Sequence, residues 1–333
     1  MAIINSNARV IELLKNANDY LSGEAIAQSL NISRAAVWKK IETLRSQGFS
    51  IDAKPKLGYR ISALPDKLFP LEIKDGLDTD IFGQHLFYYS TISSTNLVAK
   101  QLASESVAEG SVVIAEEQTK GRGRLDRKWI SPAGKNILMS VIFYPKLPPS
   151  QVFSLTMMTS LAIVKAIEIT AALSPMIKWP NDIYLHGKKT GGILTEFNAQ
   201  QDMVNFVIAG IGLNINFDPF NYPEIKDIGT SLSRESGKKI SRIKLLQSIL
   251  KEIEKGYNLI NEGKFNHIYK EWNRYSLVTG KPVRITSFNL VEDGIAESVD
   301  ENGALIFRNK YGKTKKIVCG DVSLRLRIEK QIT

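Results

Sequence analysis

The sequence predicts an α+β protein built from three folded parts, and three observations lead to this prediction. Residues 1–62 combine helical spacing of apolar residues with a basic hairpin. Residues 83–275 alternate strand-like and helix-like runs, and residues 276–333 contain short strands separated by turns. Several strands in succession between helices indicate a mixed or antiparallel sheet backed by helices. A chain of 333 residues is long enough for two or three such domains.

The first part, residues 1–62, is predicted to contain three short helices. Apolar residues repeat at helical spacing from Val10 to Ala17, and Ser22 and Ser33 are suitable N-caps for the next two helices. The apolar residues of the third helix, spaced to form one buried stripe, are Val37, Ile41 and Leu44. Two strands, 49–54 and 57–62, then form a hairpin with the basic tip Lys54-Pro55-Lys56.

This order of elements is typical of a winged helix-turn-helix domain that binds DNA. A helix with exposed cations fits the major groove, and basic wing residues can meet phosphates. Residues 1–62 carry nine Lys/Arg against five Asp/Glu, a modest excess. The candidate DNA-binding residues are Ser33, Arg34, Ala35, Trp38, Lys39, Arg45, Lys54 and Lys56. The alternative is a small helical domain used for protein contacts.

A linker is expected over residues 63–82, which contain two prolines and mixed charge. In the central part, the predicted strands are 111–116, 137–144, 177–179, 193–197 and 204–210. The predicted helices are 95–103, 152–172 and 241–262. In the last part, a small β-barrel is expected from strands at 282–286, 294–299, 305–308, 315–318 and 323–328.

Composition narrows the class of protein. The single Cys319 rules out an intramolecular disulfide and fits a reducing compartment. Three scattered histidines argue against a zinc site. The most apolar window, residues 156–176, contains Lys165 and Glu168, so we expect a buried helix and not a membrane span. Because the N-terminus also lacks the pattern of a signal peptide, we expect a cytoplasmic protein.

A basic glycine-containing string, residues 120–129, directly follows a predicted strand. It reads KGRGRLDRKW and contains five cations and two glycines. Glycines let backbone approach a ligand closely, and guanidinium groups bind phosphate in a bidentate fork. The spacing fits neither a Walker A loop nor a dinucleotide fingerprint. This string alone is compatible with two interpretations, a phosphate-binding loop and an ordinary basic surface loop.

A second string, residues 178–182, reads KWPND and precedes a hairpin. Pro180 favours an extended Trp179, so Lys178 is expected near a strand end. Asn181 and Asp182 follow at a turn, where their oxygens can hold Mg²⁺ or orient a polar ligand, or act only in the turn. Lys189 begins the return strand of the hairpin. Lys178 and Lys189 can then converge on one phosphate. The alternative is that the hairpin tip is simply exposed to solvent and binds nothing.

Together with the glycine-rich residues 210–216, these strings describe a site for a carboxylate and ATP. Activation of a carboxylate proceeds by attack on the α-phosphorus with loss of pyrophosphate. Cations that neutralise the phosphate oxygens supply most of the required stabilisation, which suits a site poor in histidine.

These strings, in this order, resemble the bifunctional biotin–protein ligase and biotin-operon repressor family. The resemblance spans nearly the whole chain, and any one string alone is weak. The matching segments are Ser94-Thr95-Asn96, Gln118, Gly121-Arg122-Gly123-Arg124, Lys178-Trp179-Pro180-Asn181-Asp182, Lys189 with Gly191-Gly192, and Gly210-Ile211-Gly212-Leu213-Asn214. Residues 33–40 are similar to the recognition helix of the repressor branch.

The resemblance implies a class II synthetase-like catalytic fold, an SH3-like C-terminal domain, and a site for biotin, ATP and Mg²⁺. Biotin-binding residues would be Ser94, Thr95, Asn96, Gln118, Gly121, Arg122, Gly123, Arg124, Lys189, Gly192 and Gly210. ATP-binding residues would be Arg122, Arg124, Trp129, Lys178, Asn181, Lys189 and Asn214. Catalysis would rest on Lys189, Arg124 and Asp182, with Asn181 near Mg²⁺.

The resemblance also implies partners: a biotin carboxyl carrier protein, operator DNA and a second copy of the chain, with no membrane. One departure stands in the basic string, where Leu125-Asp126 replaces the Arg-Gly that relatives often have. The change removes a cation and a flexible residue from the loop expected to retain the adenylate. Alternative functions are a ligase without specific DNA binding, a non-catalytic biotin sensor, and a lipoate-type acyl ligase.

Overall fold

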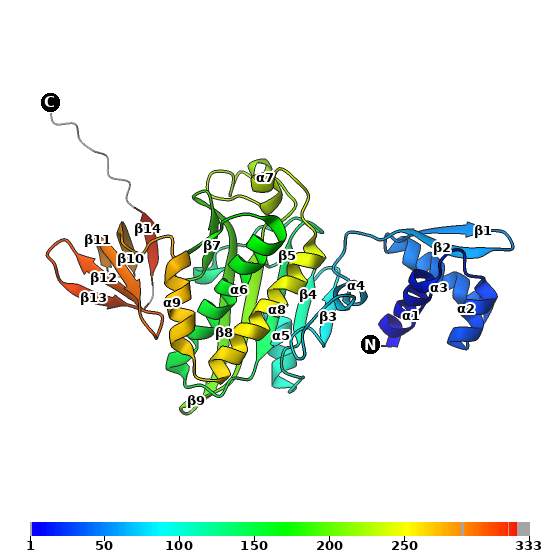
Figure 1. Cartoon of the computed structure of the whole chain (residues 1–333), viewed down its shortest axis with the longest axis horizontal. Helices are drawn as coiled ribbons and strands as arrows, with labels where there is room; N and C mark the ends of the chain where they lie inside the picture. Colours follow the sequence, from blue (N-terminus) through cyan, green and yellow to red (C-terminus); the bar gives the residue numbers. More distant parts are fainter. Residues whose placement is uncertain (1, 288–289, 319, 325–333) are drawn as a thin grey trace. The chain divides into compact units, whose positions relative to one another are not determined.

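The computed structural model describes residues 2–287, 290–318 and 320–324 (Figure 1). The chain divides into two compact units, Met1–Lys67 and Leu68–Thr333. The first unit is a helical domain with a hairpin, and the second contains the central sheet and the C-terminal sheet.

The N-terminal unit has the three predicted helices: α1 (Ala2–Asn16), α2 (Gly23–Leu30) and α3 (Arg34–Ser46). Both predicted caps are confirmed, because the Ser22 and Ser33 hydroxyls accept backbone N–H bonds of 3.0 and 3.2 Å. The predicted stripe of α3 is buried as expected: Val37, Ile41 and Leu44.

A two-stranded antiparallel hairpin follows, made of β1 (Ser50–Lys54) and β2 (Gly58–Ala63). An isolated bridge between Leu21 and Tyr59 ties it to the start of α2. Gly58 has φ +111°, and a Cβ there would lie 2.1 Å from the Leu21 carbonyl oxygen. The hairpin can approach the helices this closely because residue 58 has no side chain.

The predicted linker over residues 63–82 is wrong for most of its length. Leu68, Ile73 and Phe82 are fully buried in the main core of the second unit. Helix α4 (Pro70–Lys74) also lies in this stretch, and its Pro70 occupies a position that proline favours at a helix start. The prolines and mixed charge of this stretch suggested a linker, but several of its apolar residues pack in the core of the second unit. The boundary between the two units falls at Lys67.

The central sheet has seven strands in the order β3-β4-β5-β9-β8-β7-β6. Only the β3–β4 pair is parallel among these neighbours, and the other pairs are antiparallel. The strand bounds are β3 (Leu86–Tyr89), β4 (Val112–Ala115), β5 (Ile137–Phe143), β6 (Met176–Lys178), β7 (Asp182–Leu185), β8 (Lys188–Gln200) and β9 (Met203–Leu213). A mixed sheet was predicted; the short β3 and β7 were not.

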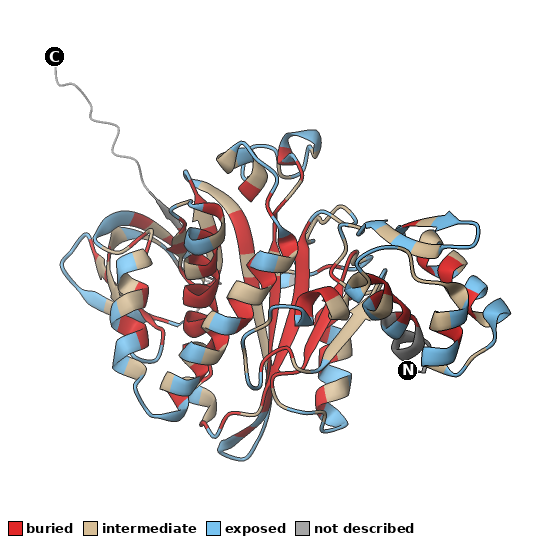
Figure 2. Ribbon diagram, turned by 45° about the vertical axis from the view of Figure 1, so that its right-hand side comes forward, coloured by how far each residue is buried: buried red, intermediate tan, exposed pale blue. Residues whose placement is uncertain are grey.

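Helices cover both faces of this sheet. On one face lie α6 (Phe153–Ala171), α8 (Arg242–Asn261) and α9 (Phe265–Tyr275), which share the main core with the sheet. Helix α5 (Thr95–Ser104) packs on the other face, where Ala99 and Ala103 meet Val113, Ile142 and Phe206 in a separate cluster. Figure 2 shows the buried residues concentrated along the sheet strands and the inner sides of the helices.

Helix α6 and the turn before it, Pro149–Ala171, are long and apolar enough to cross a membrane by composition alone. However, 78% of the apolar window is buried inside the protein. This agrees with the prediction of a buried core helix for this segment.

The C-terminal part forms a five-stranded antiparallel sheet in the order β13-β12-β11-β10-β14. Its strands are β10 (Lys281–Ser287), β11 (Leu290–Val299), β12 (Leu305–Asn309), β13 (Thr314–Ile317) and β14 (Asp321–Leu324). The last predicted strand, 323–328, lies mostly outside the described residues. The turn after β11 docks on the central part, since the Trp179 indole N–H donates to the Gly303 carbonyl at 2.9 Å.

Candidate functional site

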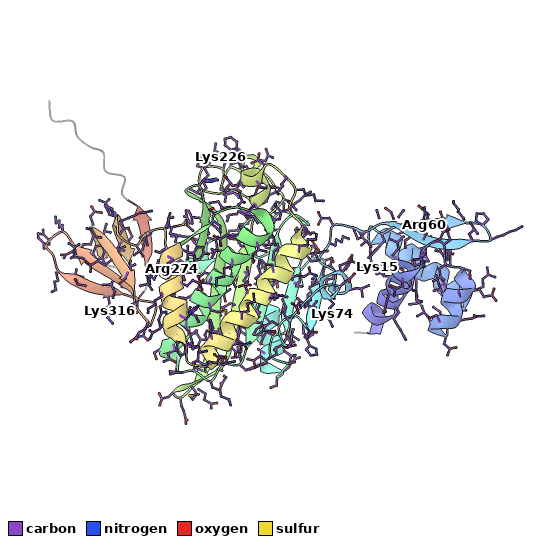
Figure 3. All side chains as sticks on the ribbon, viewed as in Figure 1. Lys15, Arg60, Lys74, Lys226, Arg274 and Lys316 are labelled. Atoms are coloured by element: carbon purple, nitrogen blue, oxygen red, sulfur yellow. The ribbon has the colours of Figure 1, made fainter. Side chains whose placement is uncertain are left out.

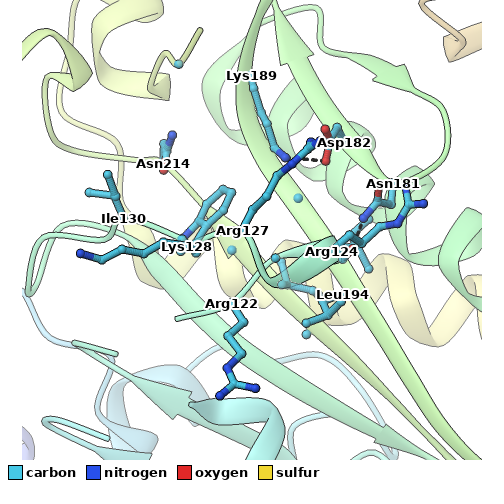
Figure 4. Close-up of a pocket in the computed structure, with 18 of the residues that line it drawn as sticks. Arg122, Arg124, Arg127, Lys128, Ile130, Asn181, Asp182, Lys189, Leu194 and Asn214 are labelled. Carbon is cyan, nitrogen blue, oxygen red and sulfur yellow. Dashed lines mark hydrogen bonds and ion pairs between the residues drawn. The ribbon is translucent and has the colours of Figure 1, made fainter. Parts of the chain in front are cut away.

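A cavity of about 410 Å³ is lined by residues of strands β6 to β9 and of the basic string of residues 120–129 (Figure 4). Nearly all the residues proposed from sequence for small-molecule binding line it. They are Ser94, Thr95, Asn96, Gln118, Arg122, Gly123, Arg124, Trp129, Lys178, Asn181, Asp182, Lys189, Gly192, Gly210 and Asn214. Gly121 is the exception; it is buried behind the cavity, where a Cβ would lie 2.9 Å from the Trp129 carbonyl oxygen.

One end of the cavity is a fixed set of hydrogen-bonding groups at the start of α5. The Gln118 Oε1 accepts from the Thr95 backbone N–H at 2.7 Å and from the Thr95 hydroxyl at 3.1 Å. These two bonds fix the orientation of the amide, so the Gln118 NH₂ group remains a donor at the cavity wall. This end therefore suits a ligand with a carbonyl flanked by polar groups.

Behind Thr95 lies a buried polar cluster that the sequence reasoning did not identify. The fully buried Ser140 hydroxyl lies 2.7 Å from Thr95 Oγ1 and 2.6 Å from Asn96 Oδ1. The Asn96 NH₂ donates to the Glu196 carboxylate at 2.7 Å. Asn96 is therefore held on both sides, and a Cβ on Gly210 would lie 2.1 Å from its Oδ1.

The basic string forms a compact turn. The Gly123 N–H donates to the Arg127 carbonyl at 2.7 Å, and Arg122 and Lys128 form a bridge. Arg124 reaches Asn181 Oδ1 at 3.3 Å and the Gly320 carbonyl at 3.5 Å. Leu125, which departs from the family pattern, is 62% exposed with φ +54°. A branched side chain is strained in this region of φ, so the departure falls where the backbone favours glycine or asparagine.

Two lysines lie at the centre of the cavity wall. Lys178 is the last residue of β6, as predicted, and its ammonium lies 3.2 Å from the Tyr184 hydroxyl. Lys189, on β8, pairs with the Asp182 carboxylate on β7 at 2.6 Å. Strand β7 separates the two lysines in the sheet, so they approach the cavity from either side of it.

The contacts of Asn181 and Asp182 decide whether these two residues can bind Mg²⁺. The Asn181 NH₂ donates to the Ile193 carbonyl, and its Oδ1 accepts from Arg124. Asp182 is paired with Lys189. Both side-chain oxygens therefore face cations, and no group of three His, Cys, Asp or Glu suited to a metal occurs within the described residues. These residues do not fit a metal site built from protein ligands alone.

The other end of the cavity contains an orphan acceptor. Asn214 is 5% exposed; its NH₂ donates to the Thr230 carbonyl at 3.1 Å, while its Oδ1 has no partner. A buried amide oxygen without a partner is costly, so this position favours a ligand donor such as an amine. Trp129 packs against β9 at Gly212, where a Cβ would lie 2.7 Å from the indole ring. This end suits a flat aromatic ligand with an exocyclic amine.

Several lining residues were not identified from sequence. Arg127 belongs to the basic string and points toward the Lys189–Asp182 pair in Figure 4. The sequence shows the charge of Arg127, but the direction in which its side chain points depends on the fold of the turn. Lys128, Trp179, Pro180, Ile211 and Gly212 stood in the strings quoted from the sequence without an assigned role. The other lining residues lie outside those strings: Ile130, Tyr184, Ile193, Leu194, Ile225, Ile228, Gly229 and Val322. Most are apolar or lie on segments without a sequence signal.

The candidate DNA interface is the exposed side of α3 and the hairpin tip. The Trp38 side chain is 55% exposed. The other exposed candidates are Ser33, Arg34, Ala35, Lys39, Lys54 and Lys56. On the hairpin, Arg60, labelled in Figure 3, and Lys54 both lie 4.8 Å from the Tyr20 ring centroid. This contact braces the base of the tip.

Arg45 does not project outward as expected. Its guanidinium donates to the Ile51 carbonyl at 2.6 and 3.1 Å and pairs with Glu42 at 2.8 Å. Position 45 lies near the end of α3, where the chain turns back into β1, so a long side chain there can satisfy strand carbonyls. Arg45 therefore joins helix to hairpin.

Family models match two parts of the chain. The Biotin/lipoate A/B protein ligase family model matches residues 88–215, and a helix-turn-helix (HTH) domain model matches residues 8–60. The first region contains the whole cavity wall from Ser94 to Asn214, and the second contains α3 and the hairpin.

Individual proteins match over a greater length. The chain is 42% identical to the bifunctional ligase/repressor BirA of Bacillus subtilis over 95% of this chain and 97% of that protein. It is 28% identical to BirA of Escherichia coli over 95% of this chain and 96% of that one. The structure of the biotin protein ligase from Aquifex aeolicus in complex with biotin and ATP aligns with a TM-score of 0.63 and 29% identity, covering 73% of this chain and 99% of that one. The chain belongs to the family of bifunctional biotin–protein ligases and repressors.

Proposed function

We propose that the chain activates biotin with ATP and transfers it to a lysine of a biotin carboxyl carrier domain. In the first step the biotin carboxylate attacks the α-phosphorus, and pyrophosphate leaves. In the second step the acceptor amine attacks the acyl carbon of biotinyl-5′-AMP, AMP leaves, and the amine loses a proton. One observation carries the proposal: a single cavity has the Gln118–Thr95 set at one end, the orphan Asn214 oxygen at the other, and lysines between them.

The Gln118 end is proposed to bind the ureido ring of biotin. This ring presents a carbonyl acceptor and two N–H donors, and its burial requires a matched partner for each. Gln118 supplies an NH₂ donor, and the hydroxyls of Ser94 and Thr95 supply groups that can donate or accept. The absence of a side chain at Gly192 keeps the wall open beside Asp182 and Lys189, and at Gly210 it makes room for the Asn96 amide.

The cations along the cavity are proposed to hold the reacting carboxylate and the phosphates. Lys189 contacts both the carboxylate and the α-phosphate, and Arg122, Arg124 and Lys178 neutralise phosphate oxygens. The backbone at Gly121 and Gly123 lets the turn approach the ligand. Mg²⁺ enters as the counterion of ATP, which agrees with the poor fit of Asn181 and Asp182 to a protein-built site.

Asp182 is proposed to act in the second step. Its carboxylate is held at 2.6 Å from Lys189, beside the place where the acyl-phosphate would form. A carboxylate there can accept hydrogen bonds from the incoming amine and receive its proton. Asn181 would keep Arg124 over the adenylate until the acceptor arrives.

At the far end, Trp129 is proposed to cover adenine while Asn214 Oδ1 accepts from its exocyclic amine. The acceptor is preformed, because the Thr230 carbonyl already engages the Asn214 NH₂. A nucleotide that lacks the amine would leave this oxygen unpaired, which disfavours its binding.

The N-terminal HTH domain is proposed to bind operator DNA in the adenylate-loaded form and to repress biotin genes. A homodimer would pair two α3 helices with a palindromic site. Because a single cysteine fits a reducing compartment, we propose that the chain works in the cytoplasm. A fluorescence titration of operator and random DNA over a salt series tests this part, since specific binding must exceed nonspecific binding at each salt concentration.

Native mass spectrometry tests the ligase proposal most directly. The protein is incubated with Mg²⁺-ATP and either biotin or lipoate, and the retained mass is read. We expect biotinyl-AMP from biotin and nothing from lipoate. Retention of lipoyl-AMP would favour the related acyl ligase, and bound biotin without adenylate would favour a sensor. Absence of any biotin binding would refute the proposal.

A further inference from the structure

We propose that His186 and Glu235 are positioning residues for the nucleotide, and this inference rests on the proposed ligase function. They form an ion pair between the β7–β8 turn and helix α7 (Leu232–Ser236). The pair holds the segment 225–235 against the edge of the cavity. Neither residue lines the cavity, so their effect passes through the residues that do.

The segment is joined to Lys189 through the backbone. The Lys189 N–H donates to the Ile228 carbonyl, and the Thr230 N–H donates to the Lys189 carbonyl, each at 2.8 Å. Residues 228–230 thus form an isolated parallel bridge with Lys189. Displacement of this segment would remove both backbone bonds that orient the lysine proposed to hold the α-phosphate.

The same segment orients Asn214. The Thr230 carbonyl accepts from the Asn214 NH₂, and the Leu232 N–H donates to the Asn214 carbonyl at 3.1 Å. Thr230 is fully buried, and its hydroxyl donates to the Glu235 carboxylate. A hydrogen-bonded path therefore runs from His186 through Glu235 and Thr230 to the acceptor proposed for adenine.

The surroundings of Glu235 keep the carboxylate of this path charged. Burial raises the pKa of Glu235, but hydrogen bonds from His186 and Thr230, with the charges of His186 and Arg234, outweigh it and lower the pKa. The carboxylate is therefore charged in the neutral range, where it can accept the hydrogen bonds of His186 and Thr230 together.

The test compares His186→Asn and Glu235→Ala with the wild type by calorimetric titration of ATP and, separately, biotin. Asparagine is chosen because His186 has φ +45°, a conformation that asparagine tolerates but alanine does not. At neutral pH we expect ATP to bind about threefold more weakly in His186→Asn and in Glu235→Ala, with unchanged biotin affinity.

Asp218→Asn is the matched control, because it breaks the Arg234–Asp218 ion pair of this segment, at 2.7 Å, and leaves the side chains of His186, Glu235 and Thr230 unchanged. It should leave ATP affinity unchanged. Equal ATP affinity in wild type and His186→Asn at neutral pH, or an equal loss of biotin affinity, would overturn the inference.

Hydrogen exchange separates this inference from the proposed function. Without ligand, His186→Asn should speed exchange of the Lys189 and Thr230 amides at least threefold, relative to Asp218→Asn. If the wild type binds neither ATP nor biotin, the ligase proposal fails, while the exchange rates still report whether the pair holds the segment. Unchanged rates would show that it does not.

Discussion

The ammonium of Lys189 lies 2.6 Å from the carboxylate of Asp182, on adjacent antiparallel strands at the centre of the cavity wall. Gly192 lies beside both groups; a Cβ there would be 3.3 Å from Asp182 Oδ1 and 3.4 Å from Lys189 Nζ. Both side chains line the cavity, so the pair has open space in front of it. A cation held by one carboxylate can still bind an anionic ligand on its open side.

Lys189→Ala should reduce the rate of adenylate formation by about 100-fold or more, because a charge that contacts the reacting oxygens is lost. Pyrophosphate release with biotin and ATP measures it. The fold should persist, since the Lys189 side chain is 31% exposed. Lys188→Ala, which changes the adjacent lysine outside the cavity lining, is the control. An unchanged rate in Lys189→Ala would remove Lys189 from the catalytic residues.

Arg124→Gly should still form biotinyl-AMP but release it early. Arg124 is held over the cavity by Asn181 and the Gly320 carbonyl, so it can cover the phosphate without taking part in the attack. Chase of labelled adenylate with unlabelled biotin should show an off-rate about tenfold higher. Lys120→Ala, an exposed cation of the same string, should leave the off-rate unchanged. A longer-lived complex in Arg124→Gly would contradict the holding role.

Asn214→Ala should raise the KM for ATP about tenfold and leave the KM for biotin unchanged, because one buried hydrogen bond to adenine is lost. Inosine triphosphate provides a sharper measurement, since it has a carbonyl in place of the amine. The wild type should prefer ATP over the inosine nucleotide, and the variant should lose most of this preference. Equal discrimination by both proteins would show that Asn214 does not read the amine.

Ser140→Ala should weaken biotin binding about fivefold, because Thr95 and Asn96 lose their shared partner behind the cavity wall. Calorimetric titration of biotin measures this change. ATP affinity should stay constant, since the cluster lies at the Gln118 end. Ser160→Ala is a comparable control; Ser160 is also fully buried but lies on α6. A similar loss in that control would indicate a general effect on folding.

The sequence predicted the elements with strong periodicity, and the reason is visible in the core. Helix α8 was predicted within one residue at each end, and its buried residues include Ile249, Ile253 and Tyr257. Strand β5 was recognised because all seven of its residues are apolar or small and all are buried. Short elements such as β7 and α7 carry too few residues for a period to appear, and contacts with the rest of the fold stabilise them.

The site was predicted through glycines and charges, and its supporting residues were not. Asn214 and Gln118 entered through the family pattern, whereas their orientation depends on Thr230 and Thr95, which only the fold brings near them. Ser140 carried a weak signal as the one polar residue of an apolar strand. Arg45 was predicted to project outward because helical spacing gives only the direction of a side chain from the helix axis. It does not show that the Ile51 carbonyl of the next strand lies within reach of the guanidinium.

Asp300→Ala should destabilise the C-terminal sheet above pH 5, and its effect should decline as the pH falls below about 4. Burial raises the pKa of Asp300, but the Lys316 ammonium and the N–H groups of Ala304 and Asn302 outweigh it and lower the pKa. A carboxyl with a lowered pKa adds stability above its unfolded value of about 3.9 and loses it as pH falls through the folded value.

The stabilisation at neutral pH should be about 1–2 kcal/mol, from two backbone hydrogen bonds and one partly exposed ion pair. Thermal melting of the full chain at pH 7 and pH 3 measures it, with exposed Glu301→Gln as the control. The turn also supplies the Gly303 carbonyl that accepts from Trp179, so Asp300→Ala should increase Trp179 exposure to a fluorescence quencher at pH 7. An equal melting shift at both pH values would show that the charge of Asp300 does not hold the turn.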